Sequence, residues 1–232
     1  MTQTNPEIRI VFPLYPGVTQ LDFTGPHQVF SRLPGAKVTT ASIGGQPVEA
    51  DGLVFSSLAD LAAVEGCDVL CVPGGLGTSE AMLDEAYMAQ IRRLGAGARY
   101  MTSVCTGSLI LAASGLIRGR RAACHWGWRE LLELFGVVPD EGRVVRDGNL
   151  FTGGGVTAGL DFAFVVAAEL AGEETAQRIQ LGLEYAPAPP FDAGRPETAP
   201  TAVVEAARKA MAGALDGRRA AAAEAASRLH SV

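Results

Sequence analysis

Cys105 is the residue of this sequence whose type and setting best fit chemistry. It follows the apolar run Arg99–Val104 and precedes the small residues Thr106–Ser108. This order is typical of a buried strand that turns into a helix, where the residue at the turn projects from the carboxyl edge of a sheet. Free N–H groups and the helix dipole favour an anion there. We therefore expect an exposed nucleophilic cysteine held largely as thiolate.

The other three cysteines fit a structural role, because most free cysteines in intracellular proteins are small core hydrophobes. We assign that role to Cys67, Cys71 and Cys124. Cys105 differs, since the Thr-Gly-Ser sequence after it fills a core poorly but opens a helix well. No histidine or second close cysteine pair completes a zinc set with Cys67 and Cys71. We therefore predict no metal site.

Asp22 and His125 are candidates to move a proton for Cys105. Asp22 stands between two apolar residues, so its carboxyl faces water or a partner unless it is held protonated. Beside a thiolate it would share one proton with the sulfur. A common helix N-terminal acid is the alternative, and periodicity does not separate the two. His125 could act as a base, but a lone histidine more often has a structural role, so a Cys-His pair is not favoured.

Two glycine-rich turns could bring backbone N–H groups to a ligand. Gly74–Gly77 follows a strand but lacks both the dinucleotide fingerprint and the Lys-Ser/Thr pair of a triphosphate loop. Adjacent glycines also let N–H groups approach an oxyanion, and we favour that role over a purely structural turn. For Gly153–Gly155 we favour a close backbone crossing.

Short apolar runs alternate with amphipathic segments along most of the chain. We expect strands over 8–13, 37–43, 68–73, 99–104 and 121–125, and helices over 21–33, 79–95, 106–116, 126–135, 157–171, 173–184 and 201–229. We also expect a connection with some helical period over 53–62 and an antiparallel hairpin of 144–147 with 149–152. This alternation predicts a doubly wound α/β fold, a mainly parallel sheet with helices on both faces. In such sheets the site lies outside the carboxyl ends of the strands.

Composition and length indicate a globular chain with one main domain. Of 232 residues, 48% are hydrophobic and 19% charged, and the net charge of −6 with no basic stripe argues against nucleic acid as a partner. No apolar run is long enough for a membrane span, and the N-terminus lacks a secretory pattern, so we expect a cytoplasmic protein. We expect an α/β domain over 1–200, ending in a Pro-rich wrapping segment, and a helical extension over 201–232 packed on the same domain.

Six segments together resemble the ThiJ/PfpI superfamily, and within it the isonitrile hydratase branch: LDFTGPHQVF, CVPGGLG, TSVCTGSLILAASGLI, CHW, RVVRDGNLFTGGGVTAGLDFA and LEYAPAPPF. The similarity runs from Ile8 to about Arg208, and six segments in order are far more specific than any one. The resemblance implies a flavodoxin-like α/β sandwich, a homodimer, and hydration of an isocyanide to an N-substituted formamide without a cofactor.

The resemblance also implies roles for single residues. Cys105 matches the nucleophile and Asp22 the acid/base carboxyl, where other superfamily members carry a glutamate. Thr106 matches the hydratase branch, whereas many protease- and amidase-like relatives have a histidine there, which argues against peptide or glutamine hydrolysis. Attack by Cys105 on the isocyanide carbon would give a thioimidate, which water would open with help from Asp22. N–H groups near Gly75, Leu76 and Thr106 would stabilise charge.

Three other functions use a similar site. A glyoxalase-type enzyme would act on small dicarbonyls with the same cysteine, and a redox sensor would only oxidise Cys105 to sulfenic or sulfinic acid. Transcription regulators with a similar CTG turn continue into a helix-turn-helix module with a basic recognition helix. This chain ends in an Ala-rich helix, so we do not expect DNA binding.

Overall fold

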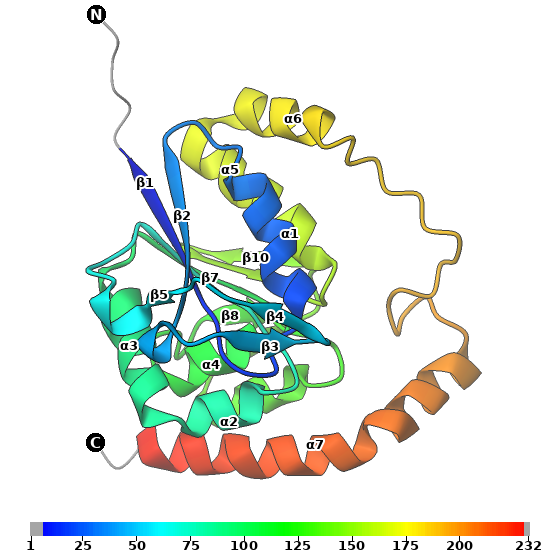
Figure 1. Ribbon diagram of the computed structural model, residues 1–232. Coiled ribbons are helices and arrows are strands. Elements are labelled where there is room, and N and C mark those ends of the chain that lie inside the picture. The colour runs from blue at the N-terminus through cyan, green and yellow to red at the C-terminus, as the bar shows by residue number, and fades with distance from the viewer. Residues whose placement is uncertain (1–6, 230–232) are drawn as a thin grey trace, which may run out of the picture.

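A seven-stranded sheet forms the centre of the part of the chain that the computed structural model describes, residues 7–229 (Figure 1). The first six residues, on which the localisation expectation draws, lie outside it. The strand order is β10-β11-β7-β6-β1-β2-β5, and every neighbouring pair is parallel except β10 with β11. The strands are β1 (Ile8–Pro13), β2 (Ala36–Ser42), β5 (Ala59–Asp60), β6 (Val69–Val72), β7 (Tyr100–Val104), β10 (Val144–Asp147) and β11 (Leu150–Gly153). The predicted α/β class, parallel sheet and hairpin are confirmed.

The central strands are continuous apolar runs because both faces of the sheet are covered. All residues of β6 and β7 are buried. Their registers pair Val72 with Ser103, and Gly153 of β11 with Val104. The carboxyl ends of three strands therefore lie side by side, with the glycine turn, Cys105 and Gly154 just beyond them.

Helices cover both faces of the sheet (Figure 1). On one face α1 (Gln20–Phe30) packs against α5 (Ala158–Ala171), which also contacts α6 (Glu173–Gly182). On the other lie α2 (Thr78–Leu83), α3 (Glu85–Gly97) and α4 (Gly107–Ala113), with α7 (Thr201–Leu229) packed outside α2 and α4. No helix within 7–229 is long and apolar enough to cross a membrane.

Two segments differ from their sequence-based predictions. The helix expected over 79–95 is broken into α2 and α3, because Asp84 caps α3 by accepting the N–H groups of Ala86 and Tyr87. The expected helical connection over 53–62 is wrong. It forms β4 (Leu53–Phe55), antiparallel to β3 (Val48–Ala50), and then β5 and the 3₁₀ turn η2 (Leu61–Ala63). A further 3₁₀ turn, η1 (Ile43–Gly45), follows β2.

The expected strand over 121–125 lies outside the main sheet. Its β8 (Arg121–Ala123) pairs with β9 (Val138–Asp140) in a separate two-stranded sheet. The Ala123 N–H donates to Thr152 Oγ1 over 2.7 Å, which holds β8 beside β11. The helix expected next is the 3₁₀ segment η3 (Arg129–Phe135), which ends at Gly136 in the left-handed conformation.

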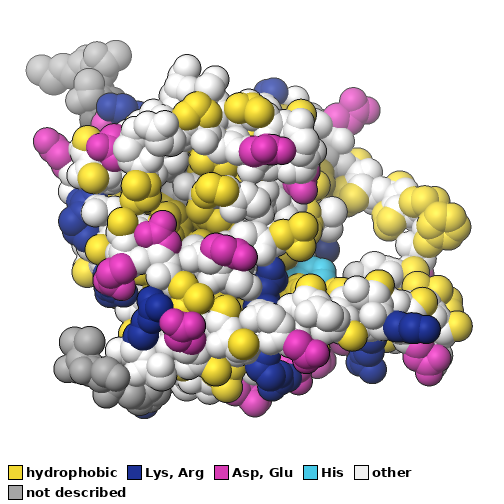
Figure 2. Space-filling model, turned by 60° about the horizontal axis from the view of Figure 1, so that its bottom comes forward, with side chains coloured by type: hydrophobic (Ala, Val, Ile, Leu, Met, Phe, Trp, Pro, Cys, Tyr) yellow, Lys and Arg dark blue, Asp and Glu magenta, His cyan; other side chains and the backbone are white. Residues whose placement is uncertain are grey.

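The Pro-rich segment of residues 186–200, here called the strap, runs along the outside of the molecule and leads into α7. Most of its side chains are exposed. The C-terminal part of α7 buries Arg218 and four alanines, whereas its N-terminal part is exposed or half-buried. In Figure 2 the strap and the N-terminal part of α7 stand away from the body of the molecule and leave an opening between them.

Candidate active site

Cys105 occupies the turn between β7 and α4 and has a φ of 57°. A non-glycine residue in this left-handed region is strained and must be held by its surroundings. The Cys105 N–H donates to Gly153 O over 3.0 Å, and Ser108 Oγ donates to Cys105 O over 2.9 Å. The predicted strand, turn and helix are therefore present, and they fix the backbone of the nucleophile on both sides.

Asp22 lies in α1, and its side chain is completely buried. Its Oδ2 accepts the Gly74 N–H over 2.9 Å, while Oδ1 accepts no hydrogen bond of normal geometry in the described structure. Burial raises the pKa of Asp22 to about 7, although the Gly74 N–H and the Cys105 thiol oppose that rise. The fold thus brings together the two residues predicted to carry the chemistry.

The expectation of an exposed thiolate at Cys105 is wrong. Cys105 is only 5% exposed, and burial raises the pKa of its thiol well above the ordinary range, with a further contribution from the Asp22 charge. The Thr106 N–H and the Arg218 charge act in the opposite direction but do not cancel the effect of burial. These shifts favour a protonated sulfur, and Cys105 and Asp22 titrate as a coupled pair.

Thr106 is buried and ties the nucleophile turn to the glycine turn. Its Oγ1 accepts the Gly75 N–H over 3.0 Å and lies 2.8 Å from Thr78 Oγ1, which in turn lies 3.1 Å from the hydroxyl of Tyr15. Its backbone N–H acts on the Cys105 sulfur and lowers the pKa of the thiol. The Thr106 side chain therefore holds the backbone of the glycine turn in place, and the Thr106 backbone N–H faces the Cys105 sulfur.

The turn Gly74–Gly77 passes so close to other backbone that side chains do not fit. A Cβ on Gly74 would lie 2.4 Å from Thr106 N, and one on Gly75 would lie 2.3 Å from Gly17 O. The Gly75 N–H is occupied by Thr106 Oγ1, whereas the Leu76 N–H makes no hydrogen bond within residues 7–229. Of these two predicted donors, only Leu76 thus has an N–H that is open to a ligand.

Arg218 is a site residue that the sequence analysis missed. It comes from α7, is 4% exposed, and donates from Nη2 to Gly75 O over 2.9 Å and to Leu76 O over 3.0 Å. Its guanidinium lies 4.4 Å from the ring centre of Trp128. No sequence pattern singles it out, because only the structure shows that positions 218, 221, 222, 225 and 226 form the buried face of α7.

His125 does not pair with Cys105. Its Nδ1 accepts the Gly127 N–H over 3.2 Å, and its ring stacks on Trp126. Burial lowers the pKa of His125, with a smaller contribution from the Arg218 charge. The structural role that was favoured for this histidine agrees with these contacts.

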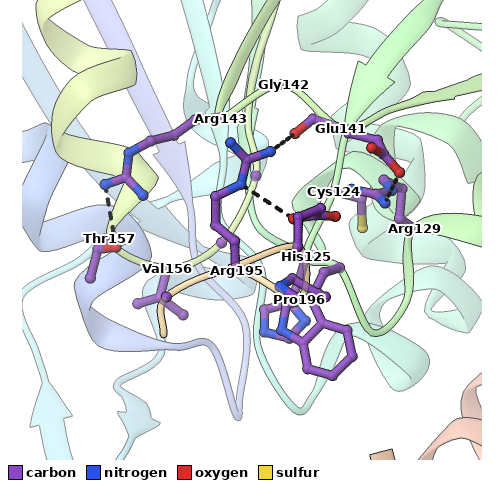
Figure 3. A pocket seen from close by; sticks show the side chains of 15 residues that line it. Cys124, His125, Arg129, Glu141, Gly142, Arg143, Val156, Thr157, Arg195 and Pro196 are labelled. Carbon is purple, nitrogen blue, oxygen red and sulfur yellow. Dashed lines mark hydrogen bonds and ion pairs between the residues drawn. The ribbon is translucent and has the colours of Figure 1, made fainter. Parts of the chain in front are cut away.

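A cavity of about 230 Å³ lies between the segments that follow β8 and β11 and the strap, and Cys105 is not among the residues that line it (Figure 3). Cys124 and His125 line it together with Gly154, the neighbour of the residue that accepts the Cys105 N–H. Three arginines also line it, and each already has an acidic partner: Arg129 with Glu141, Arg143 with Asp161 and Arg195 with Glu197. The cavity therefore offers no uncompensated positive charge to an anion.

The remaining cysteines and acids form no metal centre in the part of the chain that is described. No group of three or more His, Cys, Asp or Glu side chains there could hold an ion. All four cysteines are free, and Cys67, Cys71 and Cys124 are buried in the core as predicted.

Comparison with known proteins connects this site to one family. The profile of the DJ-1/PfpI family matches residues 8–169. The chain is 52% identical over 209 residues to an isonitrile hydratase of Pseudomonas putida, covering 90% of this chain and 92% of that protein. It is 33% identical to the protein dj-1beta of Drosophila melanogaster, covering 73% and 93%. The crystal structure of a ThiJ/PfpI family protein from Pseudomonas syringae superimposes with a TM-score of 0.90 at 41% identity, covering 96% of this chain and 97% of that one.

Proposed function

This chain belongs to the DJ-1/PfpI family, and on that premise we propose that it is an isonitrile hydratase, which adds water to an isocyanide R–N≡C and releases an N-substituted formamide. The observation that carries the proposal is the 52% identity over 90% of the chain to an isonitrile hydratase. The pairing of Cys105 with a buried carboxyl supports it, as does the lack of a histidine hydrogen-bonded to the sulfur within residues 7–229.

The first step is addition of the thiol across the terminal carbon of the isocyanide. Asp22 as carboxylate takes the proton from Cys105 while the sulfur attacks, because the thiol is not ionised beforehand. The proton then passes from Asp22 to the same carbon, which leaves a thioimidate R–N=CH–S–Cys105. The S–H bond of Cys105 breaks, one S–C bond and one C–H bond form, and Asp22 is again a carboxylate.

In the second step, water adds to the thioimidate carbon. Asp22 accepts a proton from the water and returns it to the nitrogen, which gives a tetrahedral R–NH–CH(OH)–S species. Collapse of this species releases R–NH–CHO, and the hydroxyl proton returns to the Cys105 sulfur. The N–H groups of Leu76 and Thr106 face the negative charge that develops, whereas Gly75 contributes through the shape of the turn.

The rival functions have less support in the comparisons. A redox sensor would use the same buried thiol, so oxidation of Cys105 does not by itself separate it from the hydratase. A glyoxalase-type enzyme would use the same cysteine, and only turnover separates it from the hydratase. The four free cysteines agree with the expected cytoplasmic location.

The deciding experiment incubates the purified protein with an aryl or alkyl isocyanide and measures the formamide over time. We expect Cys105→Ala to abolish product and Asp22→Asn to lower kcat by at least 10²-fold, because each removes a group that moves electrons or protons. Methylglyoxal, tested in parallel, covers the dicarbonyl alternative. Formamide production at the wild-type rate by either variant, or turnover of the dicarbonyl alone, would refute the proposal.

We also propose that the enzyme works as a homodimer in which the strap lies against the second copy. Phe191 in the strap is 78% exposed, and Leu181 and Val203 on either side of it are 82% and 52% exposed. An extended segment that holds apolar side chains away from its own chain is typical of an interface. The opening between the strap and the body, visible in Figure 2, gives room for a second copy.

A further inference from the structure

Arg218 is a buried cation without a carboxylate partner. Its guanidinium is 4% exposed, and no acidic side chain forms an ion pair with it in the described part of the chain. Burying a charge costs free energy that an apolar side chain on the same helix face would not. The neighbouring Arg219 shows the ordinary alternative, an exposed pair with Glu130 at 2.9 Å. A structural role alone therefore does not explain why an arginine stands at position 218.

The guanidinium fixes the peptide that presents the free N–H of the glycine turn. Gly75 O and the Leu76 N–H belong to one trans peptide plane and point in opposite directions. Arg218 Nη2 and Thr78 Oγ1 donate to Gly75 O over 2.9 and 2.8 Å, and Arg218 also holds Leu76 O. These bonds lock the plane and polarise it, which makes the Leu76 N–H a stronger donor on the opposite side.

The same cation is the positive charge that acts on the reactive pair. Arg218 holds the glycine turn, and this turn packs directly against Thr106, the residue after Cys105. Of the charged groups that act on the Cys105 thiol, Asp22, Cys124 and Arg218, only Arg218 favours an anionic sulfur. Tyr15 and Glu80 also act on Arg218. Thus a residue of α7 that lies more than 110 positions beyond Cys105 in sequence contributes a charge at the turn that holds Cys105.

We propose that Arg218 is a positioning residue of this enzyme, which orients the Gly75–Leu76 peptide toward the reacting centre and supplies the charge that offsets negative charge forming on Cys105. The part that concerns the reaction rests on the proposed hydratase function. The part that concerns the sulfur does not, because reactivity of Cys105 toward an alkylating reagent is measured without any isocyanide.

The test compares Arg218→Met, Arg218→Lys and the exposed control Arg219→Gln. Alkylation of Cys105 by iodoacetamide is followed by mass spectrometry of its peptide across pH 6 to 10. We expect Arg218→Met to slow alkylation by about tenfold at every pH where the wild-type rate still rises with pH, since one pKa unit is a factor of ten. Arg218→Lys should restore most of this rate, because the charge is kept, and Arg219→Gln should match the wild type.

Turnover of the isocyanide tests whether Arg218 orients the Gly75–Leu76 peptide. Loss of one oriented donor typically lowers kcat by about 10²-fold, so we expect that loss in Arg218→Met with KM changed by less than about threefold. Arg218→Lys should recover less than a tenth of kcat, since an ammonium does not hold two carbonyls and stack on Trp128.

Alkylation profiles that coincide in the wild type, Arg218→Met and Arg218→Lys would overturn the proposal. Full kcat in Arg218→Lys would overturn the role in orienting the peptide. If Arg218→Met does not fold, Arg218→Gln, which also removes the charge, takes its place in both measurements. Absence of isocyanide turnover in the wild type would refute the hydratase function and leave the alkylation result as the test of the charge.

Discussion

Gly74 donates its N–H to Asp22 Oδ2 over 2.9 Å, and this bond joins α1 to the glycine turn at the end of β6. Oδ1 accepts no hydrogen bond of normal geometry within residues 7–229. Burial of the carboxyl outweighs the Gly74 N–H and the Cys105 thiol, which both favour the carboxylate, and so its pKa rises to about 7. The site therefore holds a carboxyl that exchanges a proton near neutral pH.

The free energy of unfolding should depend on pH because of Asp22. The pKa of Asp22 is raised in the folded state from 3.8 to about 7, so the folded protein binds the proton more tightly than the unfolded chain. The resulting stability is fully present below pH 3.8 and is lost as the pH rises to about 7. Asp22→Asn removes the cost of a buried negative charge at this position. We therefore expect the free energy of unfolding of Asp22→Asn, measured by urea denaturation at pH 8, to exceed that of the wild type by about 1–3 kcal/mol.

The same comparison at low pH provides the control. At pH 4.5 the wild-type carboxyl is protonated, so the difference between the two proteins should shrink or vanish. An Asp22→Asn protein that is less stable than the wild type at pH 8, or a difference that is independent of pH, would contradict a raised pKa for Asp22.

Thr106 should tolerate serine but not valine. Valine has nearly the same shape but lacks the hydroxyl that accepts the Gly75 N–H and bonds to Thr78, so it leaves buried polar groups unsatisfied. Such a loss costs about 1–3 kcal/mol. We expect Thr106→Val to lose that amount in urea denaturation and about 10-fold or more in kcat, whereas Thr106→Ser keeps most of both. Equal behaviour of the two variants would show that the hydroxyl is dispensable.

Gly107 tests how closely α4 approaches the sheet. A Cβ at this position would lie 2.1 Å from Val72 O and 2.9 Å from Pro73 C, both backbone atoms that do not move independently. Gly107→Ala should therefore destabilise the protein by about 3 kcal/mol or more, by analogy with other overpacked cores. Gly97, at the exposed end of α3 with open space around its Cβ, is the matched control. Gly97→Ala should stay within about 1 kcal/mol of the wild type. A stable Gly107→Ala protein would disprove the close approach.

Much of the fold could be predicted because its central strands are fully buried. β6 and β7 are continuous apolar runs, and a doubly wound sheet brings their carboxyl ends together without any knowledge of side chains. β8 was misassigned to the main sheet because a run such as Arg121–Ala123 contains nothing that specifies its partner strand. The short hairpin of β3 and β4 was missed because each strand has only three residues.

The candidate site was predictable where local sequence determines it. The turn at Cys105 and the carboxyl at Asp22 were found from their neighbours, but whether the sulfur is exposed depends on what packs over it. The expectation of a thiolate considered the helix dipole and omitted desolvation, which is the larger effect here. Arg218 escaped because its partners are carbonyl oxygens 142 and 143 residues away, and backbone carbonyls leave no trace in a sequence.

The strap gives the last prediction, since its largest apolar side chain is mostly exposed on its own chain. Phe191 is 78% exposed, and a buried aromatic anchor is the kind of residue that dominates an interface. We expect the wild type to sediment as a dimer and Phe191→Asp to shift toward monomer by at least tenfold in dissociation constant, because a charge would be buried in the contact. Leu53→Asp, at a 51% exposed apolar residue in β4 away from the strap, is the control and should remain dimeric. A monomeric wild type, or a dimer that Phe191→Asp leaves intact, would show that the strap does not bind a second copy.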